Sequence, residues 1–163
     1  MGLRKKIKKF FYAKKFSKKK YLANIKDQNI LITGANSGIG LALTKKILEL
    51  NNKVLATYRE SSENLRCIKN ENLTIIKYDQ SKIYEFKDLE EEIKKNPIDL
   101  IFNCAGLFGG SFEEQQIEKL DFSKFQEVLM VNSFSILKIV QIILGNKSST
   151  KNLEVLVNIS SDA

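Results

Sequence analysis

Thr33-Gly34-Ala35-Asn36-Ser37-Gly38-Ile39-Gly40 joins a short apolar run at 29–32 to a segment at 41–50 that has the periodicity of an amphipathic helix. Three glycines at such a strand-to-helix junction allow the chain to reverse sharply and bring its backbone close to an anion at the helix N-terminus. Gly, Asn and Ser also form ordinary turns, so the pattern alone is not specific. In this context it predicts a turn that binds the pyrophosphate of a dinucleotide.

From residue 27 onward, apolar runs alternate with helical segments. The sequence predicts strands at 30–33, 53–58, 73–78, 98–104 and 153–159, and helices at 37–50, 84–95 and 120–143, the last either one long helix or a broken one. Short, nearly continuous apolar strands separated by helices indicate a parallel sheet covered on both faces. The predicted fold is α/β, a Rossmann-like, doubly wound parallel sheet with five of the usual strands.

Polar and small residues follow each predicted strand. The first strand ends in the glycine turn, and the other four end in Thr57-Tyr58-Arg59, Asp79, Asn103-Cys104-Ala105-Gly106 and Ser160-Ser161. The carboxyl ends of parallel strands meet at one edge of a sheet, and ligands of doubly wound sheets bind outside that edge. We therefore expect these five segments to converge on one crevice.

The combination resembles the classical short-chain dehydrogenase/reductase family, whose members carry a TGxxxGxG cofactor motif, NNAG after the fourth strand and an Asn-Ser-Tyr-Lys tetrad. The resemblance covers residues 27–163, and the glycine spacing fits the classical type and not the extended, epimerase-like type. It implies hydride transfer between a nicotinamide cofactor and a small carbonyl or alcohol substrate. The cofactor-binding residues that it implies in the turn are Thr33, Gly34, Asn36, Ser37, Gly38, Ile39 and Gly40.

After the third and fourth strands, the resemblance implies further cofactor-binding residues. Asp79 matches the acid that hydrogen-bonds the adenine amine, and Asn103, Ala105 and Gly106 match the segment that supports the sheet and lines the cofactor cleft. Cys104 stands where the family has its second asparagine. A buried cysteine behaves as a small apolar residue, so we expect the change to be mild.

Two members of the family's tetrad have matches in the sequence. Asn132, in the predicted long helix, matches the asparagine that helps to hold a water in the proton relay, although a polar residue inside a helix also has structural uses. Ser161 matches the serine that hydrogen-bonds the substrate. The YxxxK pair, which the family places on the helix after the fifth strand, has no counterpart there before the sequence ends at Ala163.

The end of the second strand bears on the choice of cofactor. Tyr58 occupies the position where an acidic residue would hold a ribose 2′-hydroxyl, and Arg59 follows it. A guanidinium holds a 2′-phosphate through charged, geometrically matched hydrogen bonds, whereas a carboxylate repels it. We predict that NADP(H) is preferred over NAD(H); the alternative is that Arg59 is an ordinary surface arginine.

Composition excludes several kinds of chemistry. The chain has no histidine, which excludes a Ser-His-Asp triad, a Cys-His pair and every histidine-based metal site. Cys67 and Cys104 match no CxxC spacing, so they predict neither a zinc site nor a disulfide framework. Reduced cysteines are typical of a cytoplasmic protein. No apolar stretch is long enough to predict a membrane span, since the best candidate, at 133–144, is too short and contains Lys138 and Gln141.

Charge divides the chain into a basic extension at 1–26 and a body at 27–163. The extension holds 11 of the 27 basic side chains and no acid, so its charge is +11, whereas the body has 16 basic and 19 acidic side chains and a charge of −3. Apolar residues at 3, 7, 10 and 11 fall on one helical arc among the lysines. Three interpretations stay open: a helix on an anionic membrane surface, a solvated tail and, less favoured, contact with nucleic acid.

Three accounts of the whole chain remain. We favour the first, in which the chain is the cofactor-binding N-terminal part of a longer, homo-oligomeric reductase and is inactive as it stands because the Tyr-Lys pair is missing. In the second, a short protein binds a dinucleotide without chemistry. In the third, a membrane-associated interaction protein acts mainly through residues 1–26. No residue specifies the substrate beyond a small carbonyl or alcohol.

Overall fold

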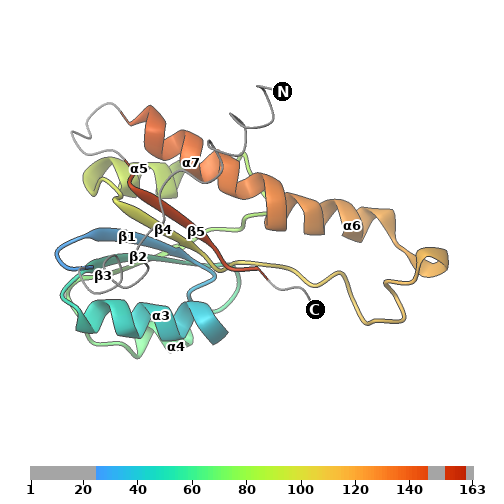
Figure 1. Ribbon diagram of the computed structural model, residues 1–163, viewed down its shortest axis with the longest axis horizontal. Coiled ribbons are helices and arrows are strands. Elements are labelled where there is room, and N and C mark those ends of the chain that lie inside the picture. Colours follow the sequence, from blue (N-terminus) through green and yellow to red (C-terminus); the bar gives the residue numbers. More distant parts are fainter. Residues whose placement is uncertain (1–24, 147–152, 161–163) are drawn as a thin grey trace, which may run out of the picture.

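The computed structural model describes residues 25–146 and 153–160 (Figure 1). Within these residues, five parallel strands form one sheet with the order β3-β2-β1-β4-β5. The strands are β1 Asn29–Thr33, β2 Lys53–Tyr58, β3 Leu73–Lys77, β4 Leu100–Asn103 and β5 Val155–Asn158. The predicted doubly wound parallel sheet is confirmed, and no bound of a strand differs from its predicted position by more than two residues.

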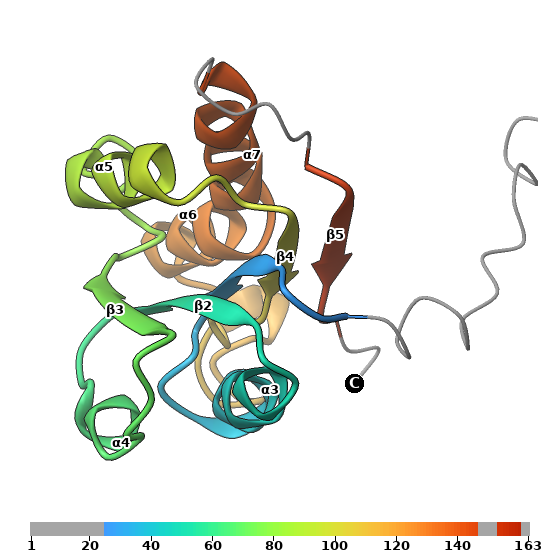
Figure 2. The ribbon, with the colours of Figure 1, turned by 90° about the vertical axis from the view of Figure 1, so that its left-hand side faces the viewer.

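Helices cover both faces of the sheet, as Figure 2 shows. α3 (Gly38–Glu49) and the short α4 (Glu63–Arg66) lie on one face. α5 (Lys87–Lys95) and α7 (Ser135–Gly145) lie on the other. The crossovers between parallel strands therefore bury both sides of the sheet, which explains why its central strands consist almost entirely of apolar residues.

Alternation along the strands creates two cores, because successive side chains point to opposite faces. Ile30 and Ile32 of β1 pack in the core on the α3 side, together with Ile47 of that helix. Leu31, between them, packs in the core on the α5 and α7 side, with Ile139. All three β1 side chains are fully buried, so β1 is the centre of the fold.

The register of the sheet aligns the carboxyl ends of its strands. Thr33 at the end of β1 pairs with Asn103 of β4, and Asn103 pairs with Asn158 of β5. On the other side of β1, the N–H of Ala35 donates to the carbonyl of Thr57 at 2.9 Å. The polar strand ends that the sequence places after each apolar run are thus brought to one edge.

The turn after α3 uses asparagine where glycine is more common. Asn51 has a φ of +60°, in the left-handed region that asparagine tolerates. Asn52 is buried, and its amide group donates to the carbonyls of Ile25 (3.1 Å) and Ile47 (3.0 Å). These bonds attach the start of the described chain to the end of α3.

Three features of the helical segments differ from the prediction. α4 has only four residues, too few to produce a periodic pattern in the sequence. α5 begins at Lys87 and not at residue 84, because residues 79–86 form successive turns, with the N–H of Lys82 donating to the carbonyl of Asp79 at 3.0 Å. A single 3₁₀ turn, η1 (Ile117–Lys119), was also not predicted.

The predicted long helix is continuous but changes its winding. α6 (Phe122–Leu129) passes through a π-helical segment, η2 (Met130–Phe134), into α7. By length and composition, the stretch Phe122–Gly145 is sufficient to cross a membrane, so the prediction that no segment is long enough is wrong. Core helices of domains outside membranes pass the same test, and α7 buries Ile136, Ile139, Ile142 and Ile143 against the sheet.

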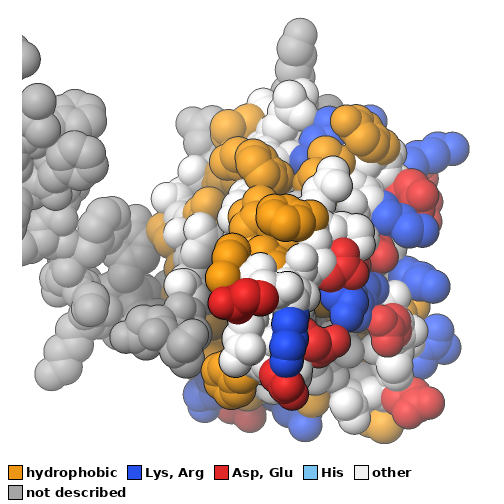
Figure 3. Space-filling view, turned by 90° about the vertical axis from the view of Figure 1, so that its right-hand side faces the viewer, with side chains coloured by type: hydrophobic (Ala, Val, Ile, Leu, Met, Phe, Trp, Pro, Cys, Tyr) orange, Lys and Arg blue, Asp and Glu red, His pale blue; other side chains and the backbone are white. Residues whose placement is uncertain are grey.

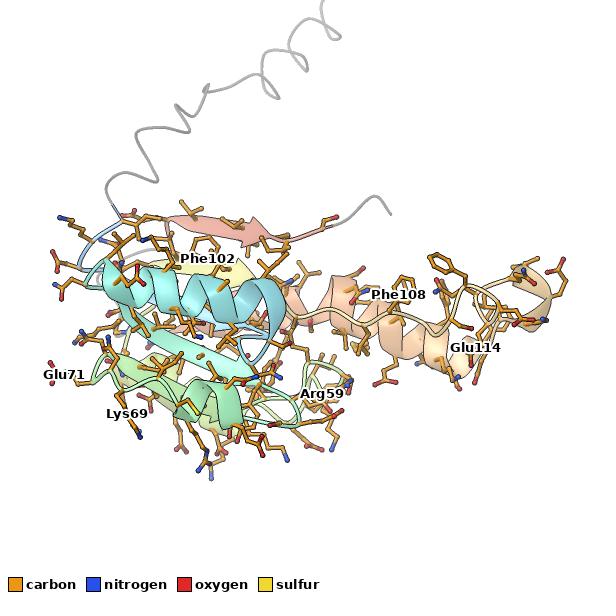
Figure 4. The ribbon with its side chains drawn as sticks, turned by 90° about the horizontal axis from the view of Figure 1, so that it is seen from below. Arg59, Lys69, Glu71, Phe102, Phe108 and Glu114 are labelled. Carbon is orange, nitrogen blue, oxygen red and sulfur yellow. The ribbon has the colours of Figure 1, made fainter. Side chains whose placement is uncertain are left out.

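α6 projects beyond the sheet, and the segment at 104–121 runs beside it (Figure 1). Figure 4 shows Phe108 and Glu114 out on this arm, with Arg59 near its base. The Glu114 carboxylate accepts bonds from the N–H of Ser111 (2.8 Å) and from Lys124 of α6 (3.2 Å). The arm is therefore held together by polar contacts of its own.

Two predictions fall outside the described residues. The basic amphipathic helix predicted around residues 3–11 of the extension lies within residues 1–24, and Ser161 follows the last described residue. Both stay predictions.

Candidate functional site

Close backbone packing makes glycine necessary in the turn between β1 and α3. Gly34 has a φ of +60°, and a Cβ added to it would lie 2.8 Å from the Cα of Ala105, after β4. A Cβ on Gly40 would collide with the carbonyl oxygen of Gly34. Gly38 differs, because its φ of +49° requires glycine although the space around its missing Cβ is open. Backbone thus packs closely against the turn at Gly34 and Gly40, its inner side, whereas the space beside Gly38, its outer side, is open.

α3 begins without a side-chain cap. Ser37 precedes it in an extended conformation, its hydroxyl makes no capping bond, and the first turn of α3 holds no acidic residue. The first backbone hydrogen bond of the helix runs from the N–H of Leu41 to the carbonyl of Ser37 (3.0 Å). The N–H groups of Gly38, Ile39 and Gly40 come before it and have no acceptor within the helix. Such free N–H groups and the helix dipole attract an anion. The turn therefore fits the pyrophosphate of a dinucleotide.

A cavity of about 230 Å³, called the crevice below, lies beside this turn at the carboxyl ends of the strands. Its walls come from the turn, the ends of β2, β3 and β4, and η2. A larger cavity of about 820 Å³ adjoins it and shares part of its wall. The predicted cofactor-binding residues that line the crevice are Gly34, Asn36, Ser37, Arg59, Asp79, Ala105 and Gly106.

Two other predicted residues lie beneath the crevice. Thr33 is fully buried; its hydroxyl donates to Oδ1 of Asn103 (2.7 Å) and accepts from the N–H groups of Cys104 (3.2 Å) and Ala105 (3.1 Å). Asn103 is buried as well. This side chain therefore ties the end of β1 to the end of β4 and supports the wall of the crevice from below. The cofactor-binding role that the resemblance implies for Thr33 stays a prediction.

The same polar network contains three residues that the sequence analysis did not single out. Nε2 of Gln80 donates to Oγ of Ser135 (2.6 Å) and to Oδ1 of Asn103 (3.4 Å), and Nδ2 of Asn103 donates to Oδ1 of Asn158 (3.1 Å). Gln80 and Ser135 are buried. The network connects the ends of four strands to α7. The sequence signal for this network is that its polar residues stand within apolar runs or just after them.

Asn132 lies in the π-helical segment η2 and faces the chain that follows β4. Its Oδ1 accepts from the N–H of Leu107 (2.8 Å), and its Nδ2 donates to the carbonyl of Leu107 (2.9 Å). The side chain therefore fixes the segment after Gly106 against the helix. π-helical turns often occur at functional sites. The water-holding role that the family resemblance implies for Asn132 stays a prediction.

The Arg59 guanidinium contacts two carboxylates. Its Nη2 lies 2.8 Å from Oε1 of Glu60, and its Nη1 lies 3.9 Å from Oε1 of Glu127 on α6. Arg59 and Glu60 line both cavities, whereas Glu127 lines only the larger one. A 2′-phosphate that binds Arg59 must therefore compete with carboxylates for it.

Asp79 stands at the end of β3, on the wall shared by the two cavities. Its Oδ1 accepts from the N–H (2.9 Å) and the hydroxyl (2.8 Å) of Ser81. Its Oδ2 has no hydrogen-bond partner within residues 25–146 and 153–160. This oxygen is thus available to accept a bond from an amine, as the resemblance implies for the adenine.

Neither thiol nor phenol chemistry is favoured at the crevice. Burial raises the pKa of the Cys104 thiol to about 11, so the thiol stays protonated at neutral pH and Cys104 acts as a small residue. Tyr78 and Lys82 have YxxxK spacing, but Tyr78 directly follows β3 and packs in the α5 and α7 core. Burial and, less strongly, the Asp79 charge raise the pKa of Tyr78 to about 12, which makes it a poor base near pH 7.

Residues 28–163 match the family described as short chain dehydrogenase. A probable NADP-dependent dehydrogenase of Haemophilus influenzae is 29% identical over 145 residues, which are 85% of this chain and 55% of the relative. Estradiol 17-beta-dehydrogenase 2 of Rattus norvegicus is 26% identical over 148 residues, which are 86% of this chain and 38% of the relative. The structure of a 4-hydroxyisoleucine dehydrogenase complexed with NADH superposes with a TM-score of 0.68 at 26% identity, covering 82% of this chain and 56% of the other.

The chain spans 38% to 55% of the length of four curated relatives that it matches. The family match nevertheless covers the sheet, the glycine turn and the crevice, which are the parts that bind a dinucleotide in such folds. The chain belongs to the short chain dehydrogenase family.

Proposed function

We propose that the protein to which this chain belongs is an NADP(H)-dependent oxidoreductase that interconverts a small carbonyl compound and an alcohol. Membership of the dehydrogenase family supports this proposal. The single observation that carries it is the crevice at the strand ends, beside a turn whose inner side admits only glycine and a helix N-terminus without a cap. The bound nicotinamide would supply the hydride acceptor or donor.

Each part of the crevice has an assigned role in holding the cofactor. The N–H groups at the start of α3 bind the pyrophosphate, and the open side of Gly38 leaves space for it. Oδ2 of Asp79 accepts from the adenine amine. Ala105 and Gly106 form a wall with little side chain, so the cofactor can lie against the backbone.

On the substrate side, we assign roles to two residues. The hydroxyl of Ser161 hydrogen-bonds the substrate oxygen, as the family resemblance implies. Asn132 is a positioning residue, because both polar atoms of its side chain bond Leu107 and so fix the segment after Gly106. The class of substrate is a small carbonyl or alcohol.

Arg59 provides the test of cofactor preference. Changing Arg59 to Glu replaces an attractive contact with a repulsive one, so we expect the affinity for NADP(H) to fall by more than about tenfold, since a charged hydrogen bond contributes about 1.5–3 kcal/mol. The affinity for NAD(H), which lacks the 2′-phosphate, should change much less. Isothermal titration with each cofactor measures both constants.

Lys69 offers a matched control for this experiment. It is exposed, lies away from Arg59 and lines neither cavity (Figure 4). Lys69→Glu makes the same change of charge and should leave both affinities unaltered. Equal losses for NADP(H) and NAD(H) in Arg59→Glu, or equal effects of the two substitutions, would remove the assignment of Arg59 to the 2′-phosphate.

We also propose that the protein works as a homo-oligomer. Figure 3 shows hydrophobic side chains gathered on the end of the molecule that carries α6. The long helix has a row of apolar side chains that are 39% to 71% exposed, namely Phe122, Phe125, Leu129, Phe134, Leu137 and Leu144. Exposed apolar rows of this kind are typical of surfaces that bind another protein.

A charge within this row should weaken self-association. Leu137 is 64% exposed, so Leu137→Glu is compatible with the folded protomer. We expect it to raise the dissociation constant of the oligomer at least about tenfold in analytical ultracentrifugation, because a charge would be desolvated on association. Tyr84→Glu, at an exposed position outside the row, should have no such effect. A parent protein that stays monomeric at high concentration would contradict the proposal.

A further inference from the structure

The crevice and the larger cavity meet at one wall, formed by Arg59, Glu60, Tyr78 and Asp79. Among the described residues that line the crevice, Arg59 is the only cation. The adenosine half of a dinucleotide belongs at this wall, because Asp79, which the family resemblance assigns to the adenine amine, lies there. The charges around Arg59 therefore act on whatever group the adenosine ribose carries.

The two carboxylates that contact Arg59 differ in how freely they can move away. Glu60 is next to Arg59 in the chain and its side chain is 77% exposed, so it can turn into solvent when a ligand binds. Glu127 lies on α6, lines the larger cavity together with Arg59 and is 49% exposed. Its backbone is fixed by the helix. The Glu127 carboxylate is therefore less free than that of Glu60 to move away from the guanidinium.

A fixed carboxylate near Arg59 has two effects on a 2′-phosphate. It shares the guanidinium, whose planar set of donors is limited, and it repels the phosphate directly. Neither effect acts on a neutral 2′-hydroxyl. Because the site is partly exposed, solvent and salt weaken both effects without removing them.

We infer that Glu127 is a specificity-determining residue, which restrains Arg59 and limits the preference for NADP(H) over NAD(H). The inference rests on the proposed cofactor site and goes beyond it, because α6 contributes no residue to the predicted set of cofactor contacts. Arg59 favours the phosphorylated cofactor, and Glu127 sets how strongly.

Glu127→Gln tests the inference, since it removes the charge and keeps the shape of the side chain. We expect the affinity for NADP(H) to rise about three- to tenfold, while the affinity for NAD(H) changes by less than about twofold. The gain should shrink in high salt because the repulsion is screened. Glu127→Lys should raise the ratio of the NADP(H) affinity to the NAD(H) affinity further.

Glu91→Gln is the matched control. Glu91 is exposed on α5 and lines neither cavity, so its substitution makes the same change in net charge at a different place. Unchanged cofactor ratios in both Glu127 variants, or equal gains in Glu91→Gln and Glu127→Gln, would overturn the inference and leave the cofactor site standing. If the parent protein binds neither cofactor, the proposed function fails, and the inference fails with it.

Discussion

Replacing Gly40 with alanine is expected to lower the free energy of unfolding by about 3 kcal/mol or more, the upper range for an overpacked site. The added Cβ would collide with the carbonyl of Gly34 and lie 3.1 Å from the Cα of Ala35. Both contacts are to backbone, so relief requires the whole turn to move away from α3. Urea denaturation followed by circular dichroism measures the loss.

Alanine substitutions at two other glycines serve as comparisons for the loss of stability in Gly40→Ala. Gly145 ends α7 with nothing within 4 Å of its missing Cβ, so Gly145→Ala should be neutral or slightly stabilising. Gly38 also has open space, but its φ of +49° means that Gly38→Ala should cost about 1–2 kcal/mol in backbone strain. If Gly40→Ala were as stable as Gly145→Ala, the close approach of turn and helix would be wrong.

Changing Thr33 to valine is expected to destabilise the protein by about 2–4 kcal/mol, because it removes a buried hydroxyl that makes three hydrogen bonds and leaves two backbone N–H groups without this acceptor. Oδ1 of Asn103 loses a donor, and the N–H groups of Cys104 and Ala105 lose an acceptor. Valine has nearly the same shape as threonine, so the loss measures hydrogen bonding and not packing. Chemical denaturation monitors stability, and cofactor titration of the folded protein monitors the crevice.

Thr33→Ser separates the hydroxyl from the methyl group. Serine keeps the three hydrogen bonds and loses one buried methyl, so it should cost only about 1 kcal/mol. A Thr33→Val protein as stable as Thr33→Ser would show that the hydroxyl does not hold β1 and β4 together.

The strands and the glycine turn were predictable because their signals are local. Continuous apolar runs identify buried parallel strands, and a glycine at position 34 or 40 meets backbone that any chain folded this way would bring near it. The right-handed crossovers of such sheets limit the strand orders that are possible. The convergence of Asp79, Ala105 and Gly106 on the crevice then follows from the strand ends alone.

Local sequence signals could not predict how deeply an individual side chain is buried or which distant side chain it contacts. Thr33 lies in the same motif as its neighbours, yet only the tertiary packing shows that it is buried under the crevice. The contact between Arg59 and Glu127 joins segments far apart in the chain, and no periodicity encodes it. The π-helical turn at Asn132 looks like ordinary helix in the sequence.

The central claim is that a dinucleotide binds in the crevice with its pyrophosphate at the start of α3. Its most direct test is an NMR titration of the labelled protein with NADP⁺, observed at the backbone amides. We predict saturable shifts that are largest at residues 36–40, 59, 79–80 and 105–106, while Lys69 and Glu71, at the opposite end of the sheet in Figure 4, stay unchanged. The claim would be contradicted if neither NADP⁺ nor NAD⁺ shifted the amides of residues 36–40, or if the largest shifts appeared around Lys69 and Glu71.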